Sequence, residues 1–297
     1  MMFSFPEFLK KPIRRHTYPI YNWLTTIFFS HIYRDCLIRP NQWLYGQRGN
    51  DYEKHRRNVN RFIRIKDSQI LIAGCGKCGD IPSWLIYKPR KITGVDYFDY
   101  DNEWDTFICS AKYKYPSTKI ELIQQDLCNM SAIESSSVDI VASDAVFEHL
   151  TNFNVSIKEM YRVLKSGGLL YATFGPLWYS YGGDHISGYD HYLNGYNHLL
   201  LSDLDYQEYL NKMGPYTHSE DDGRTWIYNN LFSRMKPTEY LTSLQDSGFK
   251  RVYVAAMIDP RALKFLRHSP FKDLLKNKYK EYDLKICSLS LIYRKEN

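Results

Sequence analysis

The stretch ILIAGCGKCGD, residues 70–80, decides the fold of this chain. It begins as an apolar run and continues into three glycines spaced G-x-G-x-x-G, which are Gly74, Gly76 and Gly79. A strand followed by such a turn and then a helix is typical of the nucleoside-binding βαβ unit. Glycine has no side chain, so the backbone turns tightly there and approaches a ligand closely. Alone, the pattern does not separate dinucleotide enzymes from other nucleoside-binding proteins.

Two carboxylates follow the glycine turn at the ends of the next predicted strands. Asp96 ends the predicted strand Lys91–Val95, where a carboxylate can accept hydrogen bonds from both ribose hydroxyls. Asp126 follows the predicted strand Lys119–Gln124. Ligands of an open parallel sheet bind beyond the carboxyl ends of its strands. We therefore expect Gly74, Asp96 and Asp126 to face one crevice.

Short apolar runs alternate with helical patterns, which predicts an α/β fold with a doubly wound, mostly parallel sheet of seven strands. The other five predicted strands are Gln69–Ala73, Val138–Ala142, Leu169–Thr173, Arg251–Met257 and Leu284–Tyr293. Helices are predicted over residues 80–87, 103–114, 152–165 and 237–247, with a basic helical segment over 260–281. The pair Gly167-Gly168 is expected to end the helix over 152–165.

The rhythm of the sequence divides the chain into four parts. Residues 1–66 form a basic, aromatic arm that is predicted to be helical. Residues 67–174 form the cofactor-binding α/β core. Residues 175–235 are rich in Tyr, His, Gly and Asp and interrupt the alternation, which indicates an inserted substrate cap. Residues 236–297 return to the alternating pattern and complete the core.

Composition limits the class of protein. The 39 Lys and Arg residues exceed the 33 Asp and Glu residues to give a net charge of +6. This mild excess allows contact with an anionic substrate or membrane surface but does not indicate nucleic-acid binding. The 26 Tyr and 6 Trp residues suit surfaces that are partly apolar and partly polar, such as sugar sites and membrane interfaces.

The cysteines and the apolar runs bear on location. The six cysteines are scattered apart from Cys75 and Cys78, so we interpret them as reduced thiols of a cytoplasmic protein. Cys75 and Cys78 form C-x-x-C inside the glycine turn with no second pair, which favours small turn residues over a zinc site. No signal-peptide pattern is visible. Residues 17–33 are too short and too polar to span a bilayer.

The order of motifs through residues 67–174 resembles the class I S-adenosylmethionine-dependent methyltransferases, and in particular the methyltransferase type 11-like enzymes of small-molecule and sugar methylation. The motifs are GCGKCG, GVD, QQDL, VDIVASDAVFEHL and EMYRVLKSGGLLYATF. A dinucleotide dehydrogenase shares the glycines and the acid after the second strand. It does not readily explain the block E-x-x-R-V-L-K-x-G-G from Glu159 to Gly168.

The resemblance implies S-adenosylmethionine as the cofactor and assigns roles to individual residues. Gly74 and Gly76 would pass under its methionine part, with Gly79 completing the turn. Asp96 would hold the ribose. Asp126 and its neighbour Leu127 would flank the adenine, with Asp126 accepting from the amino group. The remaining residues with implied roles lie on the methionine side near the reactive methyl, and they are Ser143, Asp144 and Ala145.

His185, in YSYGGDHIS, is the first candidate for a general base. A hydroxyl acceptor must lose its proton before it attacks the methyl group, and imidazole titrates close to neutral pH. His185 follows the fifth predicted strand, and Gly182 and Gly183 let the backbone bend there. A structural hydrogen bond in the cap, or an Asp184–His185 pair in a turn, is the alternative interpretation.

Three further site hypotheses remain open. His149, in FEHL, is a second catalytic candidate for which a structural role is favoured. Asp144 could orient the substrate or accept a proton. Asp184, His185 and His191 could bind a divalent cation, but their spacing is not diagnostic, so we assign no metal.

These observations predict O-methylation of a sugar, glycan or related small molecule, as in polysaccharide biosynthesis. Aromatic faces pack against sugar C–H groups, and the predicted cap is rich in such rings. A lipid or natural-product acceptor is an alternative. The sequence Ser143-Asp144-Ala145-Val146 lacks the N-P-P-Y or D-P-P-Y motif of enzymes that methylate bases, which disfavours a nucleic-acid substrate.

A non-catalytic alternative has its own motivation. Methyltransferases of this kind usually carry an acidic residue two positions before the first glycine, and here that residue is Ile72. The chain could then be a degenerate cofactor-binding domain in a membrane-associated assembly, with peripheral contact at the inner face of the membrane. The arm residues that suit such contact are Lys10, Lys11, Arg14, Arg15, Trp23, Phe28 and Phe29.

Overall fold

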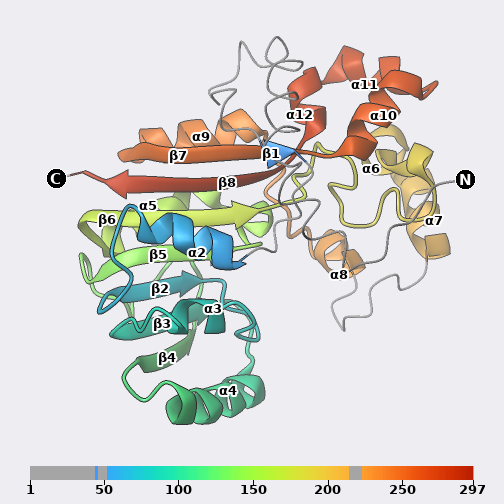
Figure 1. Ribbon diagram of the computed structural model, residues 1–297. Coiled ribbons are helices and arrows are strands. Elements are labelled where there is room, and N and C mark those ends of the chain that lie inside the picture. Colours follow the sequence, from blue (N-terminus) through green and yellow to red (C-terminus); the bar gives the residue numbers. More distant parts are fainter. Residues whose placement is uncertain (1–43, 46–51, 214–222, 297) are drawn as a thin grey trace, which may run out of the picture.

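The computed structural model describes residues 44–45, 52–213 and 223–296. They form a mixed sheet of eight strands in the order β1-β7-β8-β6-β5-β2-β3-β4 (Figure 1). Strand β8 runs antiparallel to β6 and β7, and every other neighbouring pair is parallel. The strands are β1 (Leu44–Tyr45), β2 (Gln69–Ala73), β3 (Lys91–Asp96), β4 (Lys119–Gln124), β5 (Val138–Asp144), β6 (Leu164–Phe174), β7 (Phe249–Ile258) and β8 (Ile286–Lys295).

The predicted doubly wound sheet of seven strands is confirmed by β2–β8. Strand β1 adds two residues beside β7 at the sheet edge, where Leu44 pairs with Met257. It belongs to the predicted arm, as does the helix α2 (Tyr52–Asn60). The arm residues predicted to contact a membrane lie outside the described residues. Within the described part of the chain, no helix is long and apolar enough to cross a bilayer.

Apart from α2, the described helices fall into three groups. Those that alternate with the strands are α3 (Pro82–Leu85), α4 (Asp101–Lys114), η3 (Phe147–His149), α5 (Phe153–Val163) and α9 (Pro237–Asp246). Those between β6 and α9 are η4 (Tyr192–Asn194), α6 (Asn197–Leu200), α7 (Asp203–Met213) and α8 (Gly223–Tyr228). Those between β7 and β8 are α10 (Pro260–His268), α11 (Lys272–Lys278) and α12 (Glu281–Lys285).

The predicted end of the helix at Gly167-Gly168 is wrong. Helix α5 ends at Val163, and β6 already begins at Leu164, so both glycines lie within the strand. The β5–β6 register shifts between the pairs Val138–Leu164 and Ile140–Leu169. Several residues of β6 therefore face a single residue of β5, and Gly167, at φ +76°, accommodates the irregular backbone.

The C-terminal part also differs from the prediction in detail. The basic segment over 260–281 forms separate short helices, because α10 ends at His268 and Pro270 has no amide hydrogen with which to continue it. Leu284, predicted to begin the last strand, lies in α12. The end of α9 is as expected, since Gly248 follows it at φ +91°.

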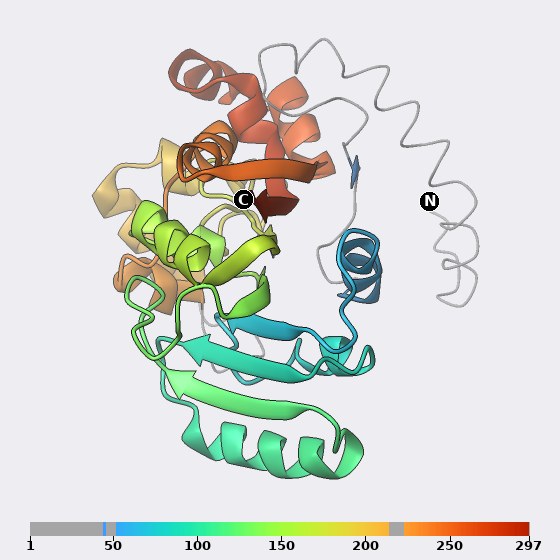
Figure 2. The ribbon, with the colours of Figure 1, turned by 90° about the vertical axis from the view of Figure 1, so that its left-hand side faces the viewer.

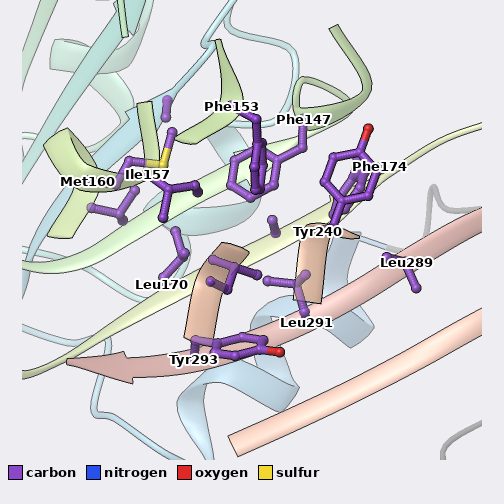
Figure 3. Close-up of a cluster of buried hydrophobic side chains, with 14 of the residues drawn as sticks. Phe147, Phe153, Ile157, Met160, Leu170, Phe174, Tyr240, Leu289, Leu291 and Tyr293 are labelled. Atoms are coloured by element: carbon purple, nitrogen blue, oxygen red, sulfur yellow. The ribbon is translucent and has the colours of Figure 1, made fainter. Parts of the chain in front are cut away.

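Both faces of the sheet are covered because its strands are apolar on both sides (Figure 2). Leu71 and Ala73 of β2 face a buried layer formed with α5 and α9, part of which Figure 3 shows. Ile70 and Ile72 face the opposite layer, which contains residues of α2, α3 and α4. This period-two alternation across β2 is what a strand buried on both faces produces. Ile72 is therefore a core residue that is fully buried.

The carboxyl ends of β2 to β6 meet at one edge of the sheet. The glycine turn follows β2, Asp96 ends β3, Asp144 ends β5, and η3 comes directly after it. The segment between β6 and α9 lies beyond this edge (Figure 1). The topology therefore places the residues predicted to bind cofactor next to those predicted to form the cap.

Candidate active site

The glycine turn is shaped by two glycines with different surroundings. Gly74 has φ +78°, and a Cβ added there would lie 2.2 Å from Cγ2 of Val146. Gly76 has φ +44°, and a Cβ there would meet nothing within 4 Å. Nε1 of Trp104 donates to the Gly76 carbonyl at 2.8 Å and fixes the turn. Gly74 is thus required for packing, and Gly76 leaves open space on the side where a ligand would approach.

Replacing Gly74 with alanine is expected to destabilise the fold by at least about 2 kcal/mol. The left-handed backbone costs about 1–2 kcal/mol for an L-residue, and the contact with Val146 adds an overpacking cost. The measurement is urea unfolding. Gly79→Ala is the matched control, because a Cβ at Gly79 meets nothing within 4 Å. Equal stability of the two variants would contradict this description of the turn.

Asp96 faces the glycine turn at the end of β3. Its Oδ2 accepts from the amide of Gly76 at 2.7 Å, and its Oδ1 accepts from the amide of Phe98 at 3.1 Å. Burial raises the pKa of Asp96, although these amides act in the opposite direction. The carboxylate is thereby fixed against the glycine turn at Gly76, and its role in holding the ribose remains a prediction.

Asp126 lies two residues past the end of β4, the strand that pairs with β3. The last pair of the β3–β4 ladder is Asp96–Gln124, and the amide of Gln125 donates to the carbonyl of Asp96 at 2.8 Å. Asp126 is exposed and accepts from the amide of Cys128 at 2.8 Å, whereas Leu127 is buried in the core. The position is suited to the edge of a bound base, and the role remains a prediction.

Ser143 and Asp144, at the end of β5, are engaged with the protein itself. The Ser143 hydroxyl donates to the Ala73 carbonyl at 2.9 Å. Both oxygens of Asp144 are bound by the guanidinium of Arg56, the shorter contact being 2.6 Å. The Tyr171 hydroxyl donates to Oδ1 of Asp144 at 2.7 Å. These partners favour a positioning role for Asp144 over proton acceptance.

Arg56, which sequence reasoning missed, is a fully buried cation from helix α2. Besides Asp144 it donates to the Ser83 hydroxyl at 3.0 Å and lies 3.5 Å from Asp80. Its guanidinium stacks over Trp84 at 4.2 Å. Burial, with Asp144 nearby, raises the pKa of Asp80 to about 7. One signal was available: Arg56 and the apolar Val59 share a helix face.

His185 occupies a constrained position in the loop after β6. Its backbone has φ +68°, a left-handed conformation that a non-glycine residue rarely adopts. The ring is hydrogen-bonded to the carbonyl of Pro176, and its Nε2 is buried without a partner. Burial lowers the pKa of His185 to about 4. The imidazole is therefore neutral at pH 7, with a free lone pair on Nε2.

Asp184 does not pair with the His185 ring through a hydrogen bond but stabilises the loop. Its Oδ2 accepts from the hydroxyls of Ser187 at 2.7 Å and Tyr206 at 2.6 Å. Burial raises the pKa of Asp184, but the nearby His198 imidazole and these hydroxyls outweigh burial and leave the pKa lowered. The alternative of an Asp184–His185 pair in a turn is not what the structure has.

The hypothetical cation set of Asp184, His185 and His191 does not assemble. The His191 Nδ1 accepts from the Leu193 amide at 3.3 Å on an exposed part of the segment. Among the described residues, the group of three metal-ligating side chains within reach of one another is Glu148, His149 and His185.

His149 lies against His185, although the two candidates come from different segments. Their ring centroids are 5.1 Å apart. The His149 Nδ1 contacts the Leu231 carbonyl at 2.8 Å, and the ring stacks on Trp226 at 4.2 Å. Burial lowers the pKa of His149 to about 3, with His185 acting in the same direction. The two histidines thus form one half-buried pair under the cap.

Aromatic rings connect this pair to the cofactor edge. Phe232 packs against both imidazoles at 5.1 and 5.2 Å. Trp226, which stacks on His149, is also 6.1 Å from Phe98, two residues after Asp96. The histidine pair and the carboxylate predicted to hold ribose are therefore joined by a short chain of ring contacts.

The sheet order, with antiparallel β8 between β6 and β7, and the glycine turn facing Asp96 together define a class I methyltransferase fold. Residues 71–172 match the family Methyltransf_11, described as a methyltransferase domain. The chain therefore contains a class I S-adenosylmethionine-dependent methyltransferase domain, and the resemblance inferred from the sequence is confirmed. S-adenosylmethionine is the cofactor of this family, and the open space over Gly76 beside the Asp96 carboxylate fits a nucleoside.

Similar proteins extend this result. Rv3030 of Mycobacterium tuberculosis (strain ATCC 25618 / H37Rv), a probable S-adenosylmethionine-dependent methyltransferase, is 30% identical over 132 residues, covering 42% of this chain and 44% of that protein. The match thus spans less than half of that relative. A candidate sarcosine dimethylglycine methyltransferase from Galdieria sulphuraria shares the fold, with 13% identity, coverage of 92% and 98% of the two chains and a TM-score of 0.52. The cyclase SpnF does so with 14% identity, coverage of 94% and 95% and a TM-score of 0.51.

Proposed function

We propose that this protein transfers a methyl group from S-adenosylmethionine to a hydroxyl oxygen of a small molecule, sugar or glycan. The observation that carries the proposal is the juxtaposition of two groups at the same strand edge. The glycine turn and Asp96 offer a nucleoside site, and the half-buried pair of His149 and His185 lies next to it, packed against Trp226 and Phe232. The domain match supports the cofactor, and the histidine pair supports a polar reacting group on the acceptor.

Each part of the site has a distinct task in this reaction. When bound, the cofactor supplies a methyl group activated by its sulfonium. Because methyl transfer is an in-line displacement, the protein contributes mainly by orienting the two reactants. Asp96 and Gly76 would orient the nucleoside. His185 would act on the acceptor, since its neutral Nε2 can interact with a hydroxyl group.

The surroundings of the histidine pair support the class of acceptor. Trp178 and Trp226 offer ring faces that can pack against the C–H faces of a sugar, and Arg234 stacks over Trp178 at 4.6 Å. A cation held beside an aromatic ring suits an acceptor that carries an anionic group. We therefore favour a sugar derivative in polysaccharide biosynthesis, acted on in the cytoplasm, over a lipid or natural-product acceptor.

A second candidate is a domain that binds the cofactor without transferring its methyl group. The buried Ile72, in place of the usual acidic residue, favours it. The cyclase SpnF, which has the same fold, provides a precedent for a different reaction on this scaffold. Cofactor binding without methyl transfer to any acceptor class would support this second candidate.

Substitution of His185 with alanine is expected to lower kcat by about 10²–10⁴-fold, the usual contribution of a group that assists proton removal. The affinity for S-adenosylhomocysteine should stay within about twofold, because His185 lies on the acceptor side. The measurement is transfer of a labelled methyl group across sugar nucleotides and lipid-linked glycans. His191→Ala, at an exposed position, is the control. Unchanged turnover in His185→Ala would remove this residue from the active site.

A further inference from the structure

Glu148, His149 and His185 converge on one point beneath the cap. Glu148 and His149 are neighbours in η3, which follows β5, and His185 comes from the loop after β6. One potential ligand atom of each side chain lies within 4.8 Å of those of the other two. Three such atoms at this separation can surround a single ion, since metal–ligand bonds are about 2.0–2.2 Å long.

Each imidazole keeps one ring nitrogen with a lone pair that is available to an ion. The His149 Nδ1 is held by the Leu231 carbonyl at 2.8 Å, and the other ring nitrogen of His185 is held by the Pro176 carbonyl. A carbonyl only accepts hydrogen bonds, so the nitrogen facing it carries the hydrogen and each Nε2 is left unprotonated. Histidines that ligate metals are oriented by this kind of bond from the opposite ring nitrogen to a carbonyl or carboxylate.

Glu148 supplies a carboxyl oxygen that has no hydrogen-bond partner. Its side chain is 2% exposed, its Oε1 accepts from the Gly175 amide at 2.9 Å, and its Oε2 is buried with no partner. No Lys or Arg of the described residues forms an ion pair with it. Burying a carboxylate whose second oxygen has no partner costs free energy, and a bound cation would offset that cost.

The surrounding rings fix the geometry of the cluster. Trp226 stacks on His149, and Phe232 packs against both imidazoles. The backbone of His185 is held at φ +68°, a strained conformation for a residue other than glycine. The ligand atoms are thus presented by packed elements, as a site for a small ion requires.

We propose that Glu148, His149 and His185 bind a divalent transition-metal ion. Two imidazole nitrogens and one carboxylate oxygen select ions such as Zn²⁺, Co²⁺ or Fe²⁺ over Mg²⁺ and Ca²⁺, which prefer oxygen ligands. Three protein ligands leave coordination positions open, which is the arrangement of a catalytic rather than a structural site. The set differs from the Asp184, His185 and His191 combination that the sequence alone suggests.

The role of the ion rests on the proposed methyltransferase function, whereas its binding does not. An acceptor hydroxyl placed on the ion would lose its proton to solvent near neutral pH, because a divalent cation lowers the pKa of a bound hydroxyl. The oxygen electron pair then forms the bond to the methyl carbon, and the electron pair of the carbon–sulfur bond returns to sulfur. With the ion bound, the Nε2 of His185 contacts the ion instead of the acceptor hydroxyl, and His185 assists proton removal as a ligand of that ion.

The test is a titration of the chelator-treated full chain with Co²⁺, followed by its visible absorption bands, with Zn²⁺ as competitor. We expect one equivalent to bind, at least tenfold weaker binding in His149→Ala, His185→Ala and Glu148→Gln, and unchanged binding in His191→Ala. Glu148→Gln changes the charge with little change of shape. Its urea unfolding curve, compared with that of the parent, tests whether the variant is folded. The proposal is overturned if no stoichiometric binding occurs, or if the three ligand variants bind as the parent does.

Calorimetry with S-adenosylhomocysteine on the same samples separates the two proposals. Uptake of S-adenosylhomocysteine without Co²⁺ binding would reject the metal site alone. Co²⁺ binding without uptake of S-adenosylhomocysteine would reject the methyltransferase function alone.

Discussion

Replacing Arg56 with methionine should lower the free energy of unfolding by about 3–5 kcal/mol, the usual cost of removing one partner of a buried ion pair. The substitution keeps most of the apolar stem and removes the charge. It leaves Asp144 and Asp80, whose side chains are 4% and 11% exposed, without their cation. Because domains of this size are stable by only about 5–15 kcal/mol, urea unfolding should show a large shift of the midpoint.

The Arg64–Asp67 pair supplies the control for this result. Both of its side chains are largely exposed, at 72% and 68%. Arg64→Met should therefore change stability by less than about 1 kcal/mol. Adding Asp144→Asn to Arg56→Met should recover part of the loss, because it removes the charge left unpaired. A cost below about 1 kcal/mol for Arg56→Met would show that this ion pair is not buried as described.

Substitution of Asp96 with alanine should weaken S-adenosylhomocysteine binding by at least roughly 100-fold. Hydrogen bonds to a charged group contribute about 1.5–3 kcal/mol each, and two ribose hydroxyls would donate to this carboxylate. The side chain also fixes the Gly76 amide at 2.7 Å, so its loss frees the turn as well. Calorimetric titration of the variant against the parent measures the change.

Two further variants serve as the comparison for Asp96→Ala. Asp96→Asn keeps one oxygen acceptor and loses the charge, so it should fall between the parent and Asp96→Ala. Asp105→Asn, an exposed carboxylate in α4, should bind as the parent does. If Asp96→Ala keeps the affinity of the parent, the assignment of the ribose site to the end of β3 is wrong.

The fold was largely predictable because its strands are buried on both faces and bounded by glycine or charged residues. The bounds of β2 and β4 were predicted correctly, since a short apolar run followed by a turn is a local signal. The glycine pair at residues 167 and 168 was misassigned because the β5–β6 register, a tertiary property, determines whether it ends a helix or lies in an irregular strand.

The candidate site was predictable only where its residues follow strand ends. Gly76 and Asp96 meet because neighbouring parallel strands end at one edge. Arg56 was missed because its partner Asp144 lies 88 positions along the chain, and a single arginine in a charged helix resembles a surface residue. Glu148 was missed for a similar reason, since its burial depends on the loop after β6.

The most direct measurement of the central claim is a pair of calorimetric titrations of the unmodified chain, one with S-adenosylhomocysteine and one with NAD. Both ligands carry an adenosine ribose, but only the first belongs to the methyltransferase family. We predict one-to-one binding of S-adenosylhomocysteine and no heat with NAD. Binding of NAD alone, or of neither ligand, would contradict the view that Gly76 and Asp96 form the nucleoside site of a methyltransferase.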